Sequence, residues 1–308
     1  MRLFLTYLFF ITMTCVQATE NEDEFLPPFI EKEIHTLEPA HAVIMDIHPE
    51  PSGKLQYFIL NSSEHIYEVL KKPLHWNREN WVTLAALVGV VAAGQHTLDN
   101  EMREFTMDES HRNKSFDDLA ELGETLGNGL YVVPGMGVAY LLGEVTDNYR
   151  LKRVALIGLE SRIATDILTT LMKVTTNRDR PNHDTKASDW HGLFGSKGPR
   201  SDAAFPSGHT ATAFSFATVI ALEYRDQPAI QILAYTAATM AGLSRIYDDD
   251  HWATDVIAGA TIGYFTTKAI YSFYTDDTEN DAPTIHVIPT MGVSSQGASA
   301  GLNLVVSF

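Results

Sequence analysis

Three short blocks of the sequence carry residue types suited to handling a phosphate group. They are Lys173-x6-Arg180-Pro181, Pro206-Ser207-Gly208-His209 and Ser244-Arg245-x5-His251-x3-Asp255. Together they supply cations, a glycine-bearing turn and two histidines, one of which has a carboxylate four residues later. This combination predicts a site for phosphoryl transfer.

In the first block, Lys173 and Arg180 are seven positions apart, which is almost two turns of a helix. A helix would present both side chains on one face, so that two cations converge on one anion. Pro181 disfavours the α conformation at the residue before it, which predicts that the helix ends with Arg180 beside the site. Arg178 lies off this face and is interpreted as a surface charge.

The second block has the features of a helix start. Ser207 can cap a helix, Gly208 lets the backbone approach a ligand, and the apolar stretch 211–222 continues as a helix. Free N–H groups at a helix N-terminus attract phosphate. His209 falls in the first turn, where its imidazole can meet the oxygen of a leaving group.

In the third block, His251 and Asp255 are four residues apart, the spacing of one helical turn. The carboxylate can accept a hydrogen bond from Nδ1–H, which leaves Nε2 unprotonated and directed outward. A histidine nucleophile needs this arrangement. Arg245 adds a third cation, which can neutralise the equatorial oxygens of a phosphoryl transition state.

The order and spacing of the blocks resemble the type-2 phosphatidic acid phosphatase family, whose superfamily includes the vanadium haloperoxidases and the class A bacterial acid phosphatases. The resemblance extends over Asn80 to Tyr274 and is densest from Lys173 to Gly263. It implies an all-α helical bundle without a cofactor or metal. It also implies site roles: His251 as nucleophile, Asp255 as its orienting partner, His209 as general acid, and Lys173, Arg180, Ser207, Gly208 and Arg245 as phosphate-binding residues.

Each block alone has a simpler explanation. A His/Asp pair at this spacing is often a local structural hydrogen bond, and Pro-Ser-Gly is often a turn, as Pro51-Ser52-Gly53 illustrates. The three consecutive carboxylates Asp248 to Asp250 lack the spacing of metal ligands, and we interpret them as a solvated segment before a helix. The three blocks together favour the phosphate site.

The N-terminus predicts export. Arg2 precedes an apolar core from Leu3 to Met13, and Ala18 fits a signal-peptidase cleavage site, so residues 1–18 are predicted to be a signal peptide. Lipid attachment at Cys15 is the second interpretation. Without its one cysteine the mature protein can form neither disulfides nor thiolate metal sites. The predicted compartment is the periplasm.

The formal charge of the chain is −17, with 39 acidic residues against 22 lysines and arginines. Such a surface repels nucleic acid, which we exclude as a partner. The positive charge needed to bind a phosphate must therefore be concentrated in the three blocks. The sequence does not indicate an oligomeric state.

Five apolar stretches leave membrane embedding open. They cover 82–94, 130–143, 211–222, 229–243 and 256–271, and each is shorter than the roughly 18 residues of a membrane span or is interrupted by polar groups. Buried helices of a water-soluble bundle fit these lengths better. Short, closely packed helices at a membrane surface are the alternative.

The predicted organisation has a helical phosphatase domain over 76–275. A lead with a β-hairpin precedes it over 19–75, with strands at Ala42–Ile47 and Leu55–Leu60, and a linker with a C-terminal β-hairpin follows over 276–308. The helices are predicted near 64–72, 79–97, 116–126, 128–143, 148–177, 208–224, 227–243 and 251–273.

These observations favour an exported, metal-independent acid phosphatase or lipid phosphate phosphatase that forms a phosphohistidine. Its substrates are expected to be phosphomonoesters or diphosphates, lipid phosphates before others, with contact to a membrane surface. Two alternatives stay open. One is a vanadium-dependent haloperoxidase, and the other is a non-catalytic envelope protein that uses its terminal strands for assembly.

Overall fold

The computed structural model describes residues 55–183, 185–195, 198, 200–275, 284–294 and 297–307. The predicted signal peptide and the strand predicted at Ala42–Ile47 lie outside these residues. The described helices are α2 (Leu55–Lys71), α3 (Arg78–Gly94), α4 (Leu98–Met107), α5 (Lys114–Gly127), α6 (Gly129–Val145), α7 (Tyr149–Thr176), α8 (Gly208–Glu223), α9 (Pro228–Tyr247) and α10 (Ala253–Tyr271). Short 3₁₀ turns cover Lys72–His75, Glu109–His111, Pro181–His183 and Ser272–Tyr274.

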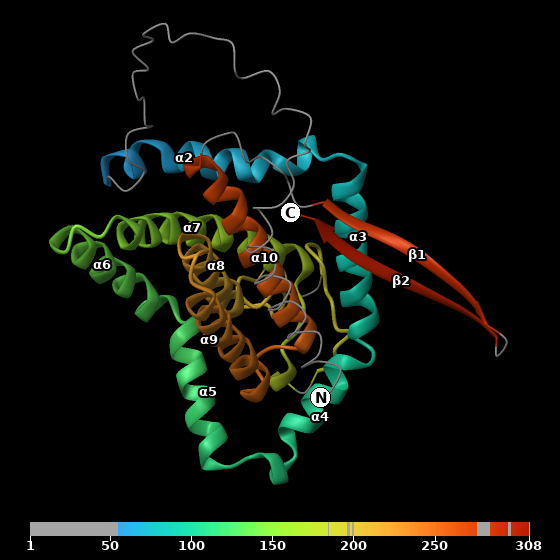
Figure 1. Ribbon diagram of the computed structural model, residues 1–308. Coiled ribbons are helices and arrows are strands. Elements are labelled where there is room, and N and C mark those ends of the chain that lie inside the picture. Colours follow the sequence, from blue (N-terminus) through green and yellow to red (C-terminus); the bar gives the residue numbers. More distant parts are fainter. Residues whose placement is uncertain are drawn as a thin grey trace, which may run out of the picture.

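Helix α8 is the centre of the bundle and packs against α7, α9 and α10 (Figure 1). Small and apolar side chains cover most of its surface, and the helix is buried almost all round. Gly259 and Gly263 of α10 let the two helices approach closely, because a Cβ at either position would overlap the backbone of α8 or of its N-cap. This contact brings the starts of α8 and α10 together.

The remaining helices flank this core. Helix α5 packs on α9, α6 on α7, and both α3 and α4 on α10, while α2 crosses α7 (Figure 1). The predicted helices are confirmed to within a few residues, except that α4 was not predicted and α2 starts earlier than expected. Helix α4 is short and mostly polar, and it buries only Asp99, Met102 and Thr106.

The strand predicted at Leu55–Leu60 is wrong, because these residues form the first turns of α2. The apolar run reads as a strand in isolation. In the structure Ile66 and Val69 lie at helical spacing, and Tyr57 joins them in the cluster that α7 and α10 share. Tertiary contacts therefore decide the state of this segment.

At the other end, β1 (Thr284–Ser294) and β2 (Gly297–Ser307) pair antiparallel. Their register runs from Thr284 opposite Ser307 to Ser294 opposite Gly297.

Two of the five apolar stretches are not buried, contrary to the prediction of a water-soluble bundle. Helix α3 buries none of its side chains, and α6 buries only Gly143. We call the exposed large side chains of these helices the apolar belt. Its members are Trp81, Val82, Leu84, Val88 and Val90 of α3 and Leu130, Tyr131, Val133, Val138, Leu141, Leu142 and Val145 of α6.

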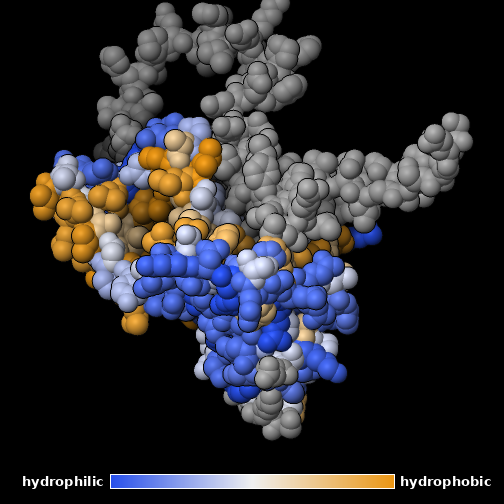
Figure 2. All heavy atoms as spheres, turned by 90° about the horizontal axis from the view of Figure 1, so that it is seen from below, coloured by the Kyte–Doolittle hydropathy of each residue, from blue (hydrophilic) through white to orange (hydrophobic). Residues whose placement is uncertain are grey.

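Figure 2 shows apolar side chains gathered on the left, the side on which α6 lies in Figure 1, and hydrophilic side chains over the centre of this view. Among the described helices, none is by itself long and apolar enough to cross a bilayer. Two bent pairs, α3 with α4 and α5 with α6, reach that length and composition together.

Candidate active site

The first block does not sit on one helix face, as the seven-residue spacing had predicted. Helix α7 ends at Thr176, and Asn177 turns the chain in the left-handed region at φ 51°. Lys173 and Arg180 are nevertheless held side by side by the loop before α8. Lys173 Nζ donates to the carbonyl of Ala203, and Arg180 Nε donates to the carbonyl of Asp202 at 2.9 Å.

The second block forms the start of α8, as predicted. Ser207 is the N-cap: its Oγ accepts from the Thr210 hydroxyl at 2.9 Å and from the Thr210 amide at 3.4 Å. Its own amide donates to the carbonyl of Asp255 at 3.0 Å, which joins the second block to the third. Space is open where a Cβ of Gly208 would lie, so a ligand can come close to this backbone.

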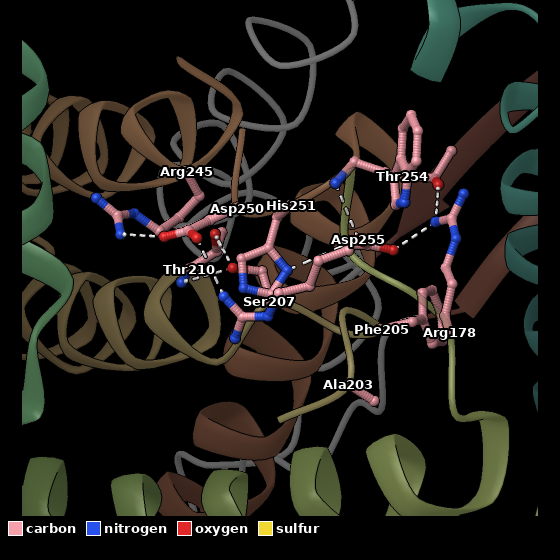
Figure 3. A network of polar contacts seen from close by, with 12 residues as sticks. Arg178, Ala203, Phe205, Ser207, Thr210, Arg245, Asp250, His251, Thr254 and Asp255 are labelled. Atoms are coloured by element: carbon pink, nitrogen blue, oxygen red, sulfur yellow. Dashed lines mark hydrogen bonds and ion pairs between the residues drawn. The ribbon is translucent and has the colours of Figure 1, made fainter. Parts of the chain in front are cut away.

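The third block begins at the end of α9 and continues into α10. Arg245 is in the last turn of α9, His251 lies in the connecting loop, and Asp255 is in the first turn of α10 (Figure 3). His251 Nδ1 lies 3.7 Å from Asp255 Oδ2. This is an ion-pair distance and is too long for the hydrogen bond that the sequence predicted. Asp255 Oδ2 instead accepts from the amide of Trp252 at 2.9 Å.

The carboxylates before His251 are partly exposed, but each also pairs with an arginine, which the sequence interpretation did not include. Asp250 bridges the two predicted phosphate-binding arginines: its Oδ1 lies 3.2 Å from Arg180 Nη1, and its Oδ2 lies 3.2 Å from Arg245 Nη1 (Figure 3). Asp248 accepts from Arg245 Nη2 at 2.6 Å, and Asp249 pairs with Arg103. The arginines around the loop, brought in by other elements, account for this pattern.

Charge and burial set the protonation of His251. Burial lowers the pKa of its imidazole to about 4; the contact with Asp255 opposes this shift, and the charges of Lys173 and Arg180 add to it. Burial would raise the pKa of Asp255, but the Arg178 charge and the His251 contact hold that pKa below its ordinary value. At neutral pH the pair is therefore a neutral imidazole beside a carboxylate.

The other titratable groups of the site follow the same physics. Burial, helped by Arg245, lowers the pKa of His209 to about 4, while Glu124 and Asp250 act against this shift. Burial and the neighbouring Arg180 lower the pKa of Lys173 to about 8. Lys173 is thus still a cation at neutral pH, and His209 is neutral in the absence of an added anion.

Two residues beside the site were not found from the sequence. Arg178, interpreted as a surface charge, is fully buried and contacts Asp255, because the turn at Asn177 takes it out of the helical pattern. An asparagine after a helical stretch is a signal for such a helix end and could have revealed it. Asp99 of α4 pairs with Arg178, and nothing local in the sequence marks it.

Within the described residues, no group of three or more His, Cys, Asp or Glu side chains is arranged to hold a metal ion.

The comparison with protein families agrees with this geometry. Residues 155–279, which hold all three blocks, match the model of the PAP2 superfamily. A similar curated protein is the lipid A 1-phosphatase of Porphyromonas gingivalis, which is 48% identical over 81 residues. The match covers 25% of this chain and 18% of that protein, so the chain spans less than a fifth of its length.

Two solved structures are also similar. LpxE of Aquifex aeolicus has a TM-score of 0.42 and 23% identity, over 57% of this chain and 96% of that one. The first transmembrane PAP2 type phosphatidylglycerolphosphate phosphatase from Bacillus subtilis has a TM-score of 0.46 and 17% identity, over 64% and 96% of the two chains.

Proposed function

We propose that this protein is a phosphoric ester hydrolase that cleaves phosphomonoesters or diphosphates, lipid phosphates before others, through a phosphohistidine. The observation that carries the proposal is the setting of His251. It is a buried, neutral histidine with Asp255 on its Nδ1 side, and the charges of Lys173 and Arg180 act on it. A neutral imidazole among cations is the arrangement that a nucleophile for phosphorus requires.

In the first step, Nε2 of His251 attacks phosphorus, a P–N bond forms and the bond from phosphorus to the leaving oxygen breaks. Lys173, Arg180 and Arg245 carry the positive charge that stabilises the transferring phosphoryl group. Asp255 stabilises the positive charge that develops on the imidazole, and His209 gives the leaving oxygen its proton.

In the second step, a water molecule attacks the phosphohistidine. His209 takes a proton from that water, the P–N bond breaks, and inorganic phosphate leaves with His251 neutral again. Both steps can proceed with the chain's own side chains, so we propose that the enzyme needs no metal ion.

The protonation of His209 adds a condition. Its pKa of about 4 leaves it neutral at neutral pH, so it cannot serve as an acid before substrate binds. A phosphate dianion between Arg245 and His209 raises that pKa, because an opposite charge favours the imidazolium. We therefore propose that substrate binding raises the pKa of His209, so that the imidazole takes up a proton from solvent and can then donate it to the leaving oxygen.

The apolar belt supports a lipid substrate. Exposed apolar surface on this scale is unfavourable in water and is typical of a surface that contacts lipid or another protein. The lipid A 1-phosphatase relative is consistent with this substrate class. With the predicted signal peptide, we propose a membrane-associated enzyme that faces the periplasm.

The test is an assay of the purified full chain in detergent and in vesicles, with a chelator present. The substrates are lipid monophosphates, lipid diphosphates, and soluble alkyl and aryl phosphates. We expect hydrolysis with a preference for lipids, and loss of hydrolysis to background in His251→Ala. The matched control is His75→Ala, which changes an exposed histidine of the 3₁₀ turn Lys72–His75, outside the three blocks. Full activity of His251→Ala would overturn the mechanism.

The two alternative functions, a vanadium-dependent haloperoxidase and a non-catalytic envelope protein, can be tested with the same purified protein. Vanadate should inhibit hydrolysis competitively, because the same cations would stabilise its five-coordinate adduct. Oxidation of bromide by vanadate-loaded protein with peroxide, together with poor turnover of every phosphate, would instead assign the chain to the haloperoxidases. A folded protein without either activity would favour the envelope-protein alternative.

A further inference from the structure

Beside the site, the Arg178 guanidinium uses all of its hydrogen-bond donors within the protein. Its side chain is fully buried, and each of its five N–H groups has an acceptor. Nε and Nη2 donate to the carbonyl of Ala187 at 3.0 and 2.6 Å. Nη1 donates to Thr254 Oγ1 at 2.8 Å and to Asp255 Oδ1, and Nη2 donates to Asp99 Oδ2 at 2.6 Å. No donor is left for a substrate, so Arg178 acts on other side chains.

The contact with Asp255 reaches the nucleophile. Asp255 Oδ1 faces Arg178, while Oδ2 accepts from the Trp252 amide and lies 3.7 Å from His251 Nδ1 (Figure 3). Each carboxylate oxygen therefore has its own partners. The guanidinium fixes the plane of the carboxylate and leaves Oδ2 as the oxygen that faces the imidazole.

Asp99 holds the other side of the guanidinium. It is 1% exposed, and its Oδ1 accepts from the Thr254 amide at 2.8 Å. Its Oδ2 accepts from Thr254 Oγ1 at 2.8 Å as well as from Arg178. The carboxylate thus ties α4 to the first turn of α10, where a negative charge is favourable.

The cluster contains two buried carboxylates and one guanidinium. Burial raises the pKa of Asp99, the negative charge of Asp255 adds to the rise, and Arg178 offsets it only in part. The groups that face Asp255 are Arg178, Lys173 and His251 as partners and Asp99 as a like charge. Loss of Arg178 would leave two carboxylates close together in a buried site, where both cannot stay ionised.

We propose that Arg178 and Asp99 are positioning residues for the proposed hydrolysis. Arg178 holds the Asp255 carboxylate ionised and aimed at His251 Nδ1, and Asp99 holds Arg178 between α4 and α10. This inference rests on the proposed function for its kinetic consequence, but its effect on the protonation of His251 can be measured without turnover.

The experiment compares Arg178→Gln, Asp99→Asn and the double variant of the full chain. Arg178→Gln should lower kcat on the order of 10–100-fold, as removal of an outer partner of an active-site ligand does, with KM nearly unchanged. The acid limb of kcat/KM should move to lower pH, because a protonated Asp255 no longer stabilises the imidazolium of His251. Asp99→Asn should also move the acid limb to lower pH, because loss of a negative charge lowers the pKa of His251.

The double variant separates positioning from simple loss of structure. Removing the like charge of Asp99 lets Asp255 ionise again, so the double variant should regain part of the kcat that Arg178→Gln loses. A purely structural role predicts a further loss instead. The matched control is Arg153→Gln, which breaks another buried pair, with Glu223 at 2.6 Å. It should lower thermal stability without moving the acid limb.

NMR titration of the His251 ring in each folded variant gives a readout independent of activity. We expect its pKa to fall in Arg178→Gln and in Asp99→Asn, and to return toward the wild-type value in the double variant, even if no phosphate is hydrolysed. Unchanged His251 titration in both variants overturns the inference. If Arg178→Gln does not fold, the Asp99→Asn shift alone decides. Loss of the proposed function would show separately, as full activity in His251→Ala.

Discussion

Arg178 and Arg180 stand two residues apart and have opposite surroundings. Arg178 is fully buried with every N–H group bonded, whereas the Arg180 side chain is 26% exposed. Within the described part of the chain, the Arg180 guanidinium makes two hydrogen bonds, to the Asp202 carbonyl and to Asp250. A saturated cation can only position its neighbours, while a cation with fewer, exposed partners can exchange them for a ligand.

Arg245 belongs with Arg180 in this comparison. Its guanidinium is buried, but the carboxylates that it contacts, Asp248 and Asp250, are 33% and 30% exposed. We call Arg180, Arg245 and Lys173 the open cluster, and Arg178 with Asp99 and Asp255 the closed cluster. If the difference is functional, changes in the open cluster should affect substrate handling, and changes in the closed cluster should affect stability and protonation.

The largest expected effect concerns His209, whose pKa responds to two cations of the open cluster. His209→Ala should lower kcat for alkyl phosphates by about 10²–10⁴-fold, because a basic leaving oxygen needs a proton. Aryl phosphates, which leave without that help, should lose much less. Steady-state rates for a series of esters measure the difference, and equal losses for both kinds would contradict a general-acid role.

Replacing one arginine from each cluster tests the comparison directly. Arg180→Ala should lower kcat/KM by about 10²–10³-fold, the usual loss for one group that stabilises transition-state charge. Its melting temperature should change little. Arg178→Gln should instead cost about 3–5 kcal/mol of stability, because it leaves buried carboxylates unpaired. Kinetics and thermal unfolding on the same preparations decide, and equal destabilisation by both would break the distinction.

The pH profile reports the protonation of the site. Lys173, with its pKa lowered to about 8, loses its charge above that pH, so kcat/KM should fall about tenfold per unit on the basic side. On the acid side, His251 becomes protonated as the pH falls through about 4, which removes the nucleophile. Two esters with different phosphate pKa values control for titration of the substrate. A flat profile from pH 7 to 10 would refute the role of Lys173.

The smallest expected effect concerns Asp250, which bridges both arginines of the open cluster. A phosphate must compete with this carboxylate, so Asp250→Asn should lower the inhibition constant for inorganic phosphate by roughly twofold to fivefold, the size expected for a partly exposed ion pair. The control is Asp249→Asn, which breaks the pair with Arg103 instead. The same shift in both variants would show a general charge effect.

Most of the helices and the three blocks could be identified from the sequence alone. The long helices follow from apolar periodicity, and the N-cap at Ser207 follows from local backbone chemistry, so both could be predicted without a fold. The grouping of His251, Asp255 and the cations was also visible, because three blocks at a characteristic order and spacing point to one kind of site.

The contacts between side chains of the site, in contrast, depended on the tertiary structure. Helical spacing placed Lys173 and Arg180 on one face, yet α7 ends at Thr176 and the loop carbonyls of Asp202 and Ala203 bring the two cations together. The same turn buries Arg178, which the spacing had assigned to the surface. Helical spacing predicts the direction of a side chain only as far as the residue at which the helix ends.

Burial was likewise decided by the fold. The apolar stretches of α3 and α6 resemble those of α8 and α10 in length and composition, but α8 is enclosed by three helices while α3 and α6 lie at the edge of the bundle. The apolar composition of a segment shows that the segment is suited to burial. Whether it is buried depends on the elements packed against it, and these come from distant parts of the chain.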